Sequence, residues 1–160
     1  MNTEIRDWPH FAMEMLSIIL LIGCFVPLIA FDVPDGAQVP MHFDIDGTSN
    51  QVGPAKDLVW LPIMSLLIFV VLTLTEKFPK MINTPRKLSE NGREFIRVHG
   101  WKFTRELKLC FTAMMCYMCY WMFAVAAGKA ATMPVWGFIV CIGAMLIVTI
   151  RFYYLLYNYN

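Results

Sequence analysis

Four long apolar runs, separated by polar segments, constrain this chain more than any other feature of its sequence. They cover residues 12–31, 58–75, 107–127 and 134–151. An α-helix of about 20 apolar residues crosses a hydrocarbon core about 30 Å thick, and lipid tolerates only backbone that satisfies its own hydrogen bonds. The composition agrees, because 58% of the residues are hydrophobic and 16% are charged. We therefore predict an all-α, polytopic membrane protein with four transmembrane helices in a single domain, residues 1–160.

The two long loops differ sharply in their basic residues. Residues 32–57 contain only Lys56, whereas residues 76–106 contain eight lysines and arginines. Short loops rich in Lys and Arg stay in the cytoplasm. We expect residues 76–106 to be a cytoplasmic connector, residues 32–57 to be an irregular extracytoplasmic loop, and both termini to be cytoplasmic. The expected location is the cell (inner) membrane, and the formal net charge of +1 indicates no nucleic-acid-binding surface.

The connector is predicted to be partly helical. Ser89 followed by Glu90 is typical of a helix start, and no proline interrupts the chain from there into the third span. Phe95, Val98 and Trp101 are spaced to form an apolar face. The basic residues follow from the topology rule alone, or they contact a soluble partner or anionic lipid. The candidates for such contacts are Arg86, Lys87, Arg93, Arg97, Lys102 and Arg105.

The extracytoplasmic loop contains a short match to a catalytic motif, FDIDGT at residues 43–48. It is similar to the aspartate motif of haloacid-dehalogenase-type phosphatases, but that motif requires a large α/β domain, so we expect no catalytic role. His42, Asp44 and Asp46 are candidate metal ligands for zinc or calcium, although the twelfth position of a calcium loop would be Gly53. We favour a structural role for these side chains and expect no cofactor.

Polar and thiol groups inside the predicted spans are few. Glu14 is either an intramembrane proton carrier or an interfacial residue, and we expect the second. Cys116 and Cys119 form a C-x-x-C pair in the third span, which suggests either a quinone-linked thiol oxidoreductase or simple packing, and we expect packing. The predicted spans contain almost no buried charge, which argues against a stand-alone carrier.

Residues 30–108 resemble the DUF1648 family of membrane proteins, with the family signature over residues 30–80. The matching positions are Pro34, Val39, Pro40, His42, Phe43, Gly47, Gly53 and Lys56, with Asn50 where the family usually has Asp. Some family members carry a similar connector. The resemblance implies a multi-pass membrane protein without an established reaction, and one relative confers immunity to a secreted toxin and holds a repressor at the membrane.

The expected function is therefore non-enzymatic recognition and signalling, or toxin immunity. The expected partners are a soluble cytoplasmic regulator or an extracytoplasmic peptide or toxin, besides the lipid bilayer and further copies of the chain. Two alternatives stay open. The first is a membrane enzyme or metal-dependent protein that uses His42, Asp44 and Asp46, and the second is an accessory subunit of a transporter.

Overall fold

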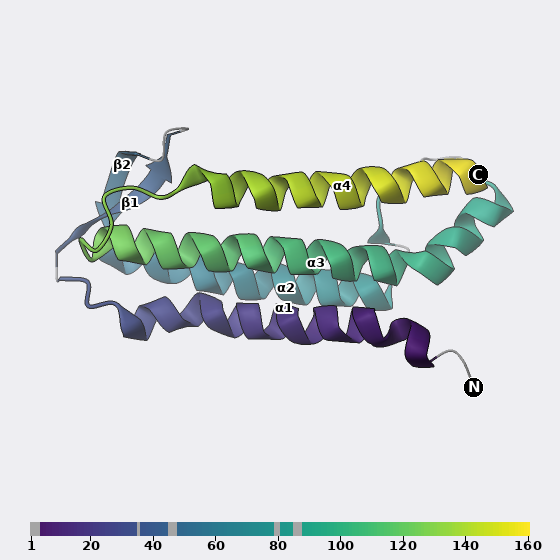
Figure 1. The fold of residues 1–160 in the computed structure, drawn as a ribbon, viewed down its shortest axis with the longest axis horizontal. Helices are drawn as coiled ribbons and strands as arrows, with labels where there is room; N and C mark the ends of the chain where they lie inside the picture. Colours follow the sequence, from purple (N-terminus) through teal and green to yellow (C-terminus); the bar gives the residue numbers. More distant parts are fainter. Residues whose placement is uncertain (1–3, 35, 45–47, 79–80, 85–87) are drawn as a thin grey trace.

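The computed structural model describes residues 4–34, 36–44, 48–78, 81–84 and 88–160. Its long helices run side by side along one direction, with a small β-hairpin at one end (Figure 1). The elements are α1 (Glu4–Ala30), β1 (Gln38–Phe43), β2 (Ser49–Pro54), the 3-10 helix η1 (Ala55–Val59), α2 (Trp60–Lys77), α3 (Glu90–Ala126) and α4 (Val135–Tyr159). All four α-helices are long and apolar enough to cross a membrane, as the sequence predicts.

The two ends of the bundle carry different connections. The hairpin and the link from α3 to α4 lie at one end, which we call the hairpin end (Figure 1). The N-terminus, the C-terminus and the link from α2 to α3 lie at the other, which we call the terminal end. The two termini and the connector therefore share one end of the bundle, which is the relative arrangement that the charge distribution predicts.

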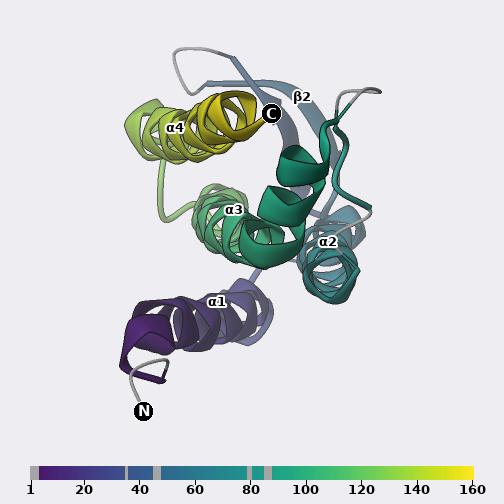
Figure 2. The same ribbon diagram turned by 90° about the vertical axis from the view of Figure 1, so that its right-hand side faces the viewer.

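Helix α3 is the central element of the bundle. It contacts α1, α2 and α4, and it lies between them when the molecule is viewed from the terminal end (Figure 2). Its buried residues recur every three or four positions, so they form one stripe along the helix. This stripe includes Gly92, Ile96, Gly100, Thr104, Lys108, Thr112, Met115, Cys119 and Met122. The small residues in the stripe permit close approach of neighbouring helices.

Local interactions explain where α3 begins and where it ends. At the start, the Ser89 hydroxyl accepts a hydrogen bond from the backbone N–H of Gly92 at 3.1 Å, which confirms the predicted helix start. At the other end, Gly128 has a φ of 68°, a left-handed conformation that glycine adopts readily and that stops a helix. The predicted third span, residues 107–127, is thus only the second half of a continuous helix of 37 residues.

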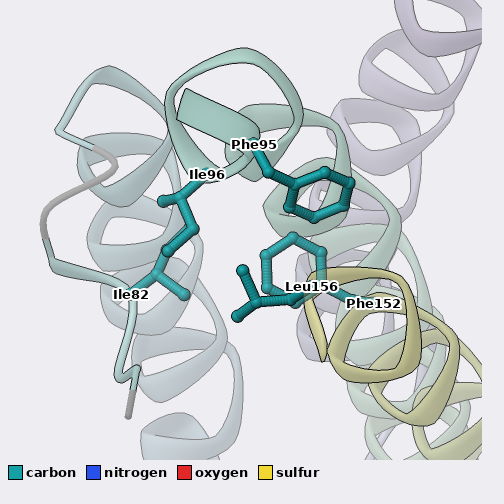
Figure 3. Packing of buried hydrophobic residues seen from close by; sticks show 5 residues of the cluster. All are labelled: Ile82, Phe95, Ile96, Phe152 and Leu156. Carbon is teal, nitrogen blue, oxygen red and sulfur yellow. The ribbon is translucent and has the colours of Figure 1, made fainter. Parts of the chain in front are cut away.

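A hydrophobic cluster at the terminal end ties the connector to α4. Ile82, Phe95 and Ile96 pack against Phe152 and Leu156 (Figure 3). This packing explains why α4 continues to Tyr159, beyond the predicted boundary at residue 151.

The apolar face predicted for the connector is partly wrong. Phe95 is buried, but Val98 is 43% exposed and Ile96 is buried instead. The reason is that the buried stripe of α3 passes through Gly92, Ile96 and Gly100, and Val98 is two positions from each of the last two, on the opposite side of the helix. The C-terminal residue adds a polar contact here, because the Asn160 side-chain oxygen accepts a hydrogen bond from the Ser89 backbone N–H at 2.6 Å.

The prediction that residues 32–57 are irregular is wrong. Strands β1 and β2 pair in antiparallel fashion, with Val39 opposite Gly53 and with irregular register around His42. Pro40 has no N–H to donate, but a two-stranded sheet has only edge strands, where proline is tolerated. The backbone N–H of Asp44 also donates to the carbonyl of Thr48 at 2.8 Å.

The hairpin is fixed to the bundle through one face. Val39 has no exposed surface, and it packs with Leu58 after the hairpin and with Met122 and Phe123 of α3. Apolar burial of this kind gives the hairpin a defined position on the end of α3.

Candidate functional site

Four charged side chains from three helices meet inside the bundle, and we call them the ion cluster. Lys108 of α3 places its Nζ 2.7 Å from a carboxylate oxygen of Glu14 in α1 and 2.6 Å from one of Glu76 in α2. Arg105, one turn earlier in α3, approaches the same two carboxylates at 3.3 Å and 2.8 Å. Two acids and two bases therefore form a closed, formally neutral ring.

The ion cluster is largely shielded from solvent. The side chain of Lys108 is completely buried, and those of Glu76, Glu14 and Arg105 are only 9%, 17% and 22% exposed. Lys108 also donates to the hydroxyl of Thr73 at 3.2 Å. Charges in such surroundings are tolerated when they are paired and hydrogen-bonded.

Aromatic rings and a backbone carbonyl complete the surroundings of the two bases. The Lys108 amine lies 4.8 Å from the centre of the Phe69 ring, and the Arg105 guanidinium lies 5.2 Å from that of Trp101. Arg105 also donates to the backbone carbonyl of His10 at 3.4 Å. Both cations thus have favourable contacts in addition to those with the carboxylates.

The members of the ion cluster lie at one depth along the bundle. Lys108 precedes the end of α3 by 18 residues, Glu14 precedes the end of α1 by 16, and Glu76 follows the start of α2 by 16. At 1.5 Å per residue these positions are about 24–27 Å from the hairpin end, near one boundary of a hydrocarbon core about 30 Å thick. The ion cluster therefore fastens α1 and α2 to α3 close to the terminal-end face of the membrane.

Sequence reasoning missed this arrangement. The prediction that the spans contain almost no buried charge is wrong, because Lys108 is fully buried inside α3. Glu14, expected to be interfacial, is ion-paired with two cations of α3, and its side chain is only 17% exposed. The sequence did contain a signal for it. Glu14 and Glu76 lie near one end of the first and second spans, and two bases, Arg105 and Lys108, lie near that same end of the third span.

The signature residues differ in exposure, since Val39 is buried whereas others lie on the surface. His42, Asp44 and Lys56 are exposed, as is Pro34. Pro40 and Phe43 lie in β1, and Asn50 and Gly53 in β2. A Cβ atom at Gly53 would lie 2.8 Å from the Met41 side chain, so this glycine permits close contact across the hairpin.

Of the proposed metal ligands, Asp46 lies outside the described residues, as does Gly47 of the signature. Within the described part of the chain, no group of three or more His, Cys, Asp or Glu side chains is arranged to hold a metal ion.

The basic residues of the connector divide into distinct environments. Arg93 is exposed, and Arg97 is exposed in an ion pair with Glu94 at 2.6 Å. Lys102 is half-buried with its amine 5.1 Å from the centre of the Trp101 ring. Arg105 departs from the expected surface role, because its charge is used inside the ion cluster. Arg86 and Lys87 lie outside the described residues.

The cysteines of the spans are free thiols. Cys24 and Cys119 are buried together with Met115 in one hydrophobic cluster, with Cys116 and Met118 packed against it. This placement agrees with the predicted packing role.

The structure defines a class: a bundle of four membrane-length helices, capped by a β-hairpin at one end and fastened by an ion cluster near the other. No protein-family model, curated protein or solved structure gives a significant match to the chain.

Proposed function

We propose that this chain is a DUF1648-type protein of the cell (inner) membrane that recognises an extracytoplasmic peptide and signals to a soluble cytoplasmic partner. In this proposal the hairpin end faces outward and the terminal end faces the cytoplasm. The support for that orientation is the distribution of Lys and Arg, since residues 76–106 carry eight and residues 32–57 carry one.

One observation carries the proposal: α3 packs against the hairpin at one end and, at the other, forms part of the connector and packs against the rest of it. At one end of α3, Met122 and Phe123 pack with Val39 of the hairpin. At the other end, Phe95 and Ile96 pack with Ile82 of the connector. The 37 residues of α3 measure about 55 Å along the helix axis, which bends near the terminal end (Figure 1). A displacement of the hairpin would therefore act directly on the element that forms the cytoplasmic surface.

The outer surface suits a peptide with apolar side chains. Met41 and Val52 of the hairpin are 44% and 63% exposed, next to the exposed imidazole of His42. Toxin immunity would be one form of this recognition, in which the captured peptide is a secreted toxin.

The inner surface offers a hollow for a soluble partner. A cavity of about 350 Å³ is lined by Asn91, Glu94, Phe95, Val98, His99 and Tyr159. The exposed guanidinium groups of Arg93 and Arg97 lie on the same stretch of α3. An apolar hollow beside Arg93, and beside Arg97 in its exposed pair with Glu94, favours a partner that carries an acidic residue next to an apolar anchor.

The first test is crosslinking in native membranes, followed by identification of the captured proteins. Arg93→Glu/Arg97→Glu should abolish capture of a soluble regulator, whereas Arg93→Lys/Arg97→Lys keeps the charge and should retain most of it. Recovery of the same proteins with all three versions would refute signalling through this surface.

A second test addresses the link between the two ends. Val39→Ser removes a fully buried contact with α3, and Gln38→Ser changes its exposed neighbour. If α3 couples the ends, Val39→Ser alters regulator capture and Gln38→Ser does not. Equal capture by both variants, at equal amounts of folded protein, would contradict coupling through α3.

A further inference from the structure

A second cavity lies at the terminal end, between α1, α3 and α4. It adjoins the hollow described above, with which it shares Phe95, His99 and Tyr159. Its volume is about 300 Å³, and its lining includes His10, Lys102, Phe103, Glu106, Arg151 and Leu155. The three helices each supply part of the wall. The cavity shares no residue with the ion cluster.

The cavity lies at the depth of lipid headgroups. Arg151 follows the start of α4 by 16 residues, His10 precedes the end of α1 by 20, and Lys102 precedes the end of α3 by 24. These spacings correspond to about 24, 30 and 36 Å from the hairpin end. The cavity therefore spans the boundary of a hydrocarbon core about 30 Å thick.

The polar groups of the cavity favour an anion. Lys102 and Arg151 are cationic, while Glu106 is the one acid in the lining, and it is already ion-paired with Arg151. His10 and His99 add two imidazoles to the wall. Cations in a pocket between membrane helices are a typical site for the phosphate of an anionic lipid.

The apolar wall favours a lipid over a soluble phosphate. Phe103, Phe152 and Leu155 line the cavity beside the cations. On α4, Ile147 and Ile150 are 68% and 66% exposed, so the helix continues from the cavity as an apolar surface on which an acyl chain can lie. A free phosphate would gain no binding energy from these apolar groups. A phospholipid can contact the cations with its headgroup and the apolar groups with its acyl chains.

We infer that this cavity is a binding site for an anionic phospholipid of the terminal-end leaflet, with Lys102 and Arg151 contacting the headgroup phosphate. The acyl chains lie along α4 and the neighbouring face of α3. The site does not depend on recognition by the hairpin or on a soluble partner.

The test is lipid retention by the full chain, measured by native mass spectrometry after purification from nanodiscs of mixed phosphatidylglycerol and phosphatidylcholine. The wild-type chain should retain phosphatidylglycerol preferentially. Lys102→Gln/Arg151→Gln should weaken retention at least about tenfold, since each cation near an anionic lipid surface contributes about 1 kcal/mol.

The matched control is Arg93→Gln/Arg97→Gln, which makes the same change in net charge on exposed positions outside the cavity. It should retain phosphatidylglycerol as the wild type does. Glu106→Gln removes the competing acid and should increase retention severalfold, a gain that a misfolded variant would not show. Equal loss in the control pair, no preference for phosphatidylglycerol, or unchanged or weaker retention by Glu106→Gln would overturn the site.

Discussion

The amine of Lys108 lies between two carboxylates in a position without any exposed surface. Removing one member of a buried charged group leaves its partners uncompensated, which costs more than the pair itself contributes. The closed ring of Glu14, Glu76, Arg105 and Lys108 should therefore respond to single substitutions far more strongly than to changes that preserve its neutrality.

At this scale we predict that Lys108→Met lowers the free energy of unfolding by about 3–5 kcal/mol, because an acid is left without its base. Unfolding in detergent micelles measures the change. Lys77→Met, at an exposed lysine of the same end, should change stability by no more than about 0.5 kcal/mol.

Neutrality of the ion cluster provides a further check. Lys108→Met/Glu14→Gln leaves Arg105 with Glu76, one base with one acid, and should be more stable than Lys108→Met alone. If the two substitutions simply add their losses, the carboxylate of Glu14 does not depend on Lys108 and our account of the ring is incorrect.

Helix α4 shows how a single small residue sets the distance between two elements. A Cβ atom at Gly137 would lie 2.6 Å from two ring carbons of Tyr117 in α3, whereas one at Gly143 would meet nothing within 4 Å. The Tyr117 hydroxyl also donates to the carbonyl of Pro134, immediately before α4. The start of α4 is thus positioned by the ring of Tyr117, which lies directly against the backbone of Gly137.

For this element we predict opposite effects of the same substitution at two glycines. Gly137→Ala should lower stability by about 1–3 kcal/mol, because the ring of Tyr117 must shift. Gly143→Ala should raise stability by up to about 1 kcal/mol, because alanine has the higher helix propensity and the site is open. Thermal unfolding of the two variants would measure both changes, and equal effects would show that the Tyr117 contact does not hold α4.

At the scale of the whole molecule, the fold places the termini and the connector at one end and the hairpin at the other (Figure 1). Combined with the positive-inside rule, this arrangement predicts opposite sides of the membrane for the exposed residues of the hairpin and those of the connector.

We predict that an impermeant maleimide labels Lys56→Cys in intact cells, whereas Arg93→Cys reacts only after the membrane is permeabilised. Both positions are exposed, so access depends on the side of the membrane alone. The unmodified chain measures background labelling of the native cysteines. The reverse pattern would place the hairpin in the cytoplasm and refute the proposed orientation.

The sequence by itself determined the four helices, the start of α3 at Ser89, and the arrangement of both termini with the connector. These features depend on local physical chemistry: apolar length, a capping hydroxyl and the density of basic residues. The hairpin was missed because alternation in VPMHF and NQVGP is interrupted by proline, glycine and a register irregularity.

Only the tertiary structure decided which charges meet and which surfaces remain open. Lys108 and Glu14 are 94 residues apart in the chain, and Arg105 and Glu76 are 29 apart. A buried ion pair depends on the rotation of each helix about its own axis, and that rotation is set by packing of Gly100, Thr104 and the rest of the α3 stripe against three neighbours. No single segment contains that information, so the ion cluster and the lipid cavity exist only once the helices are assembled.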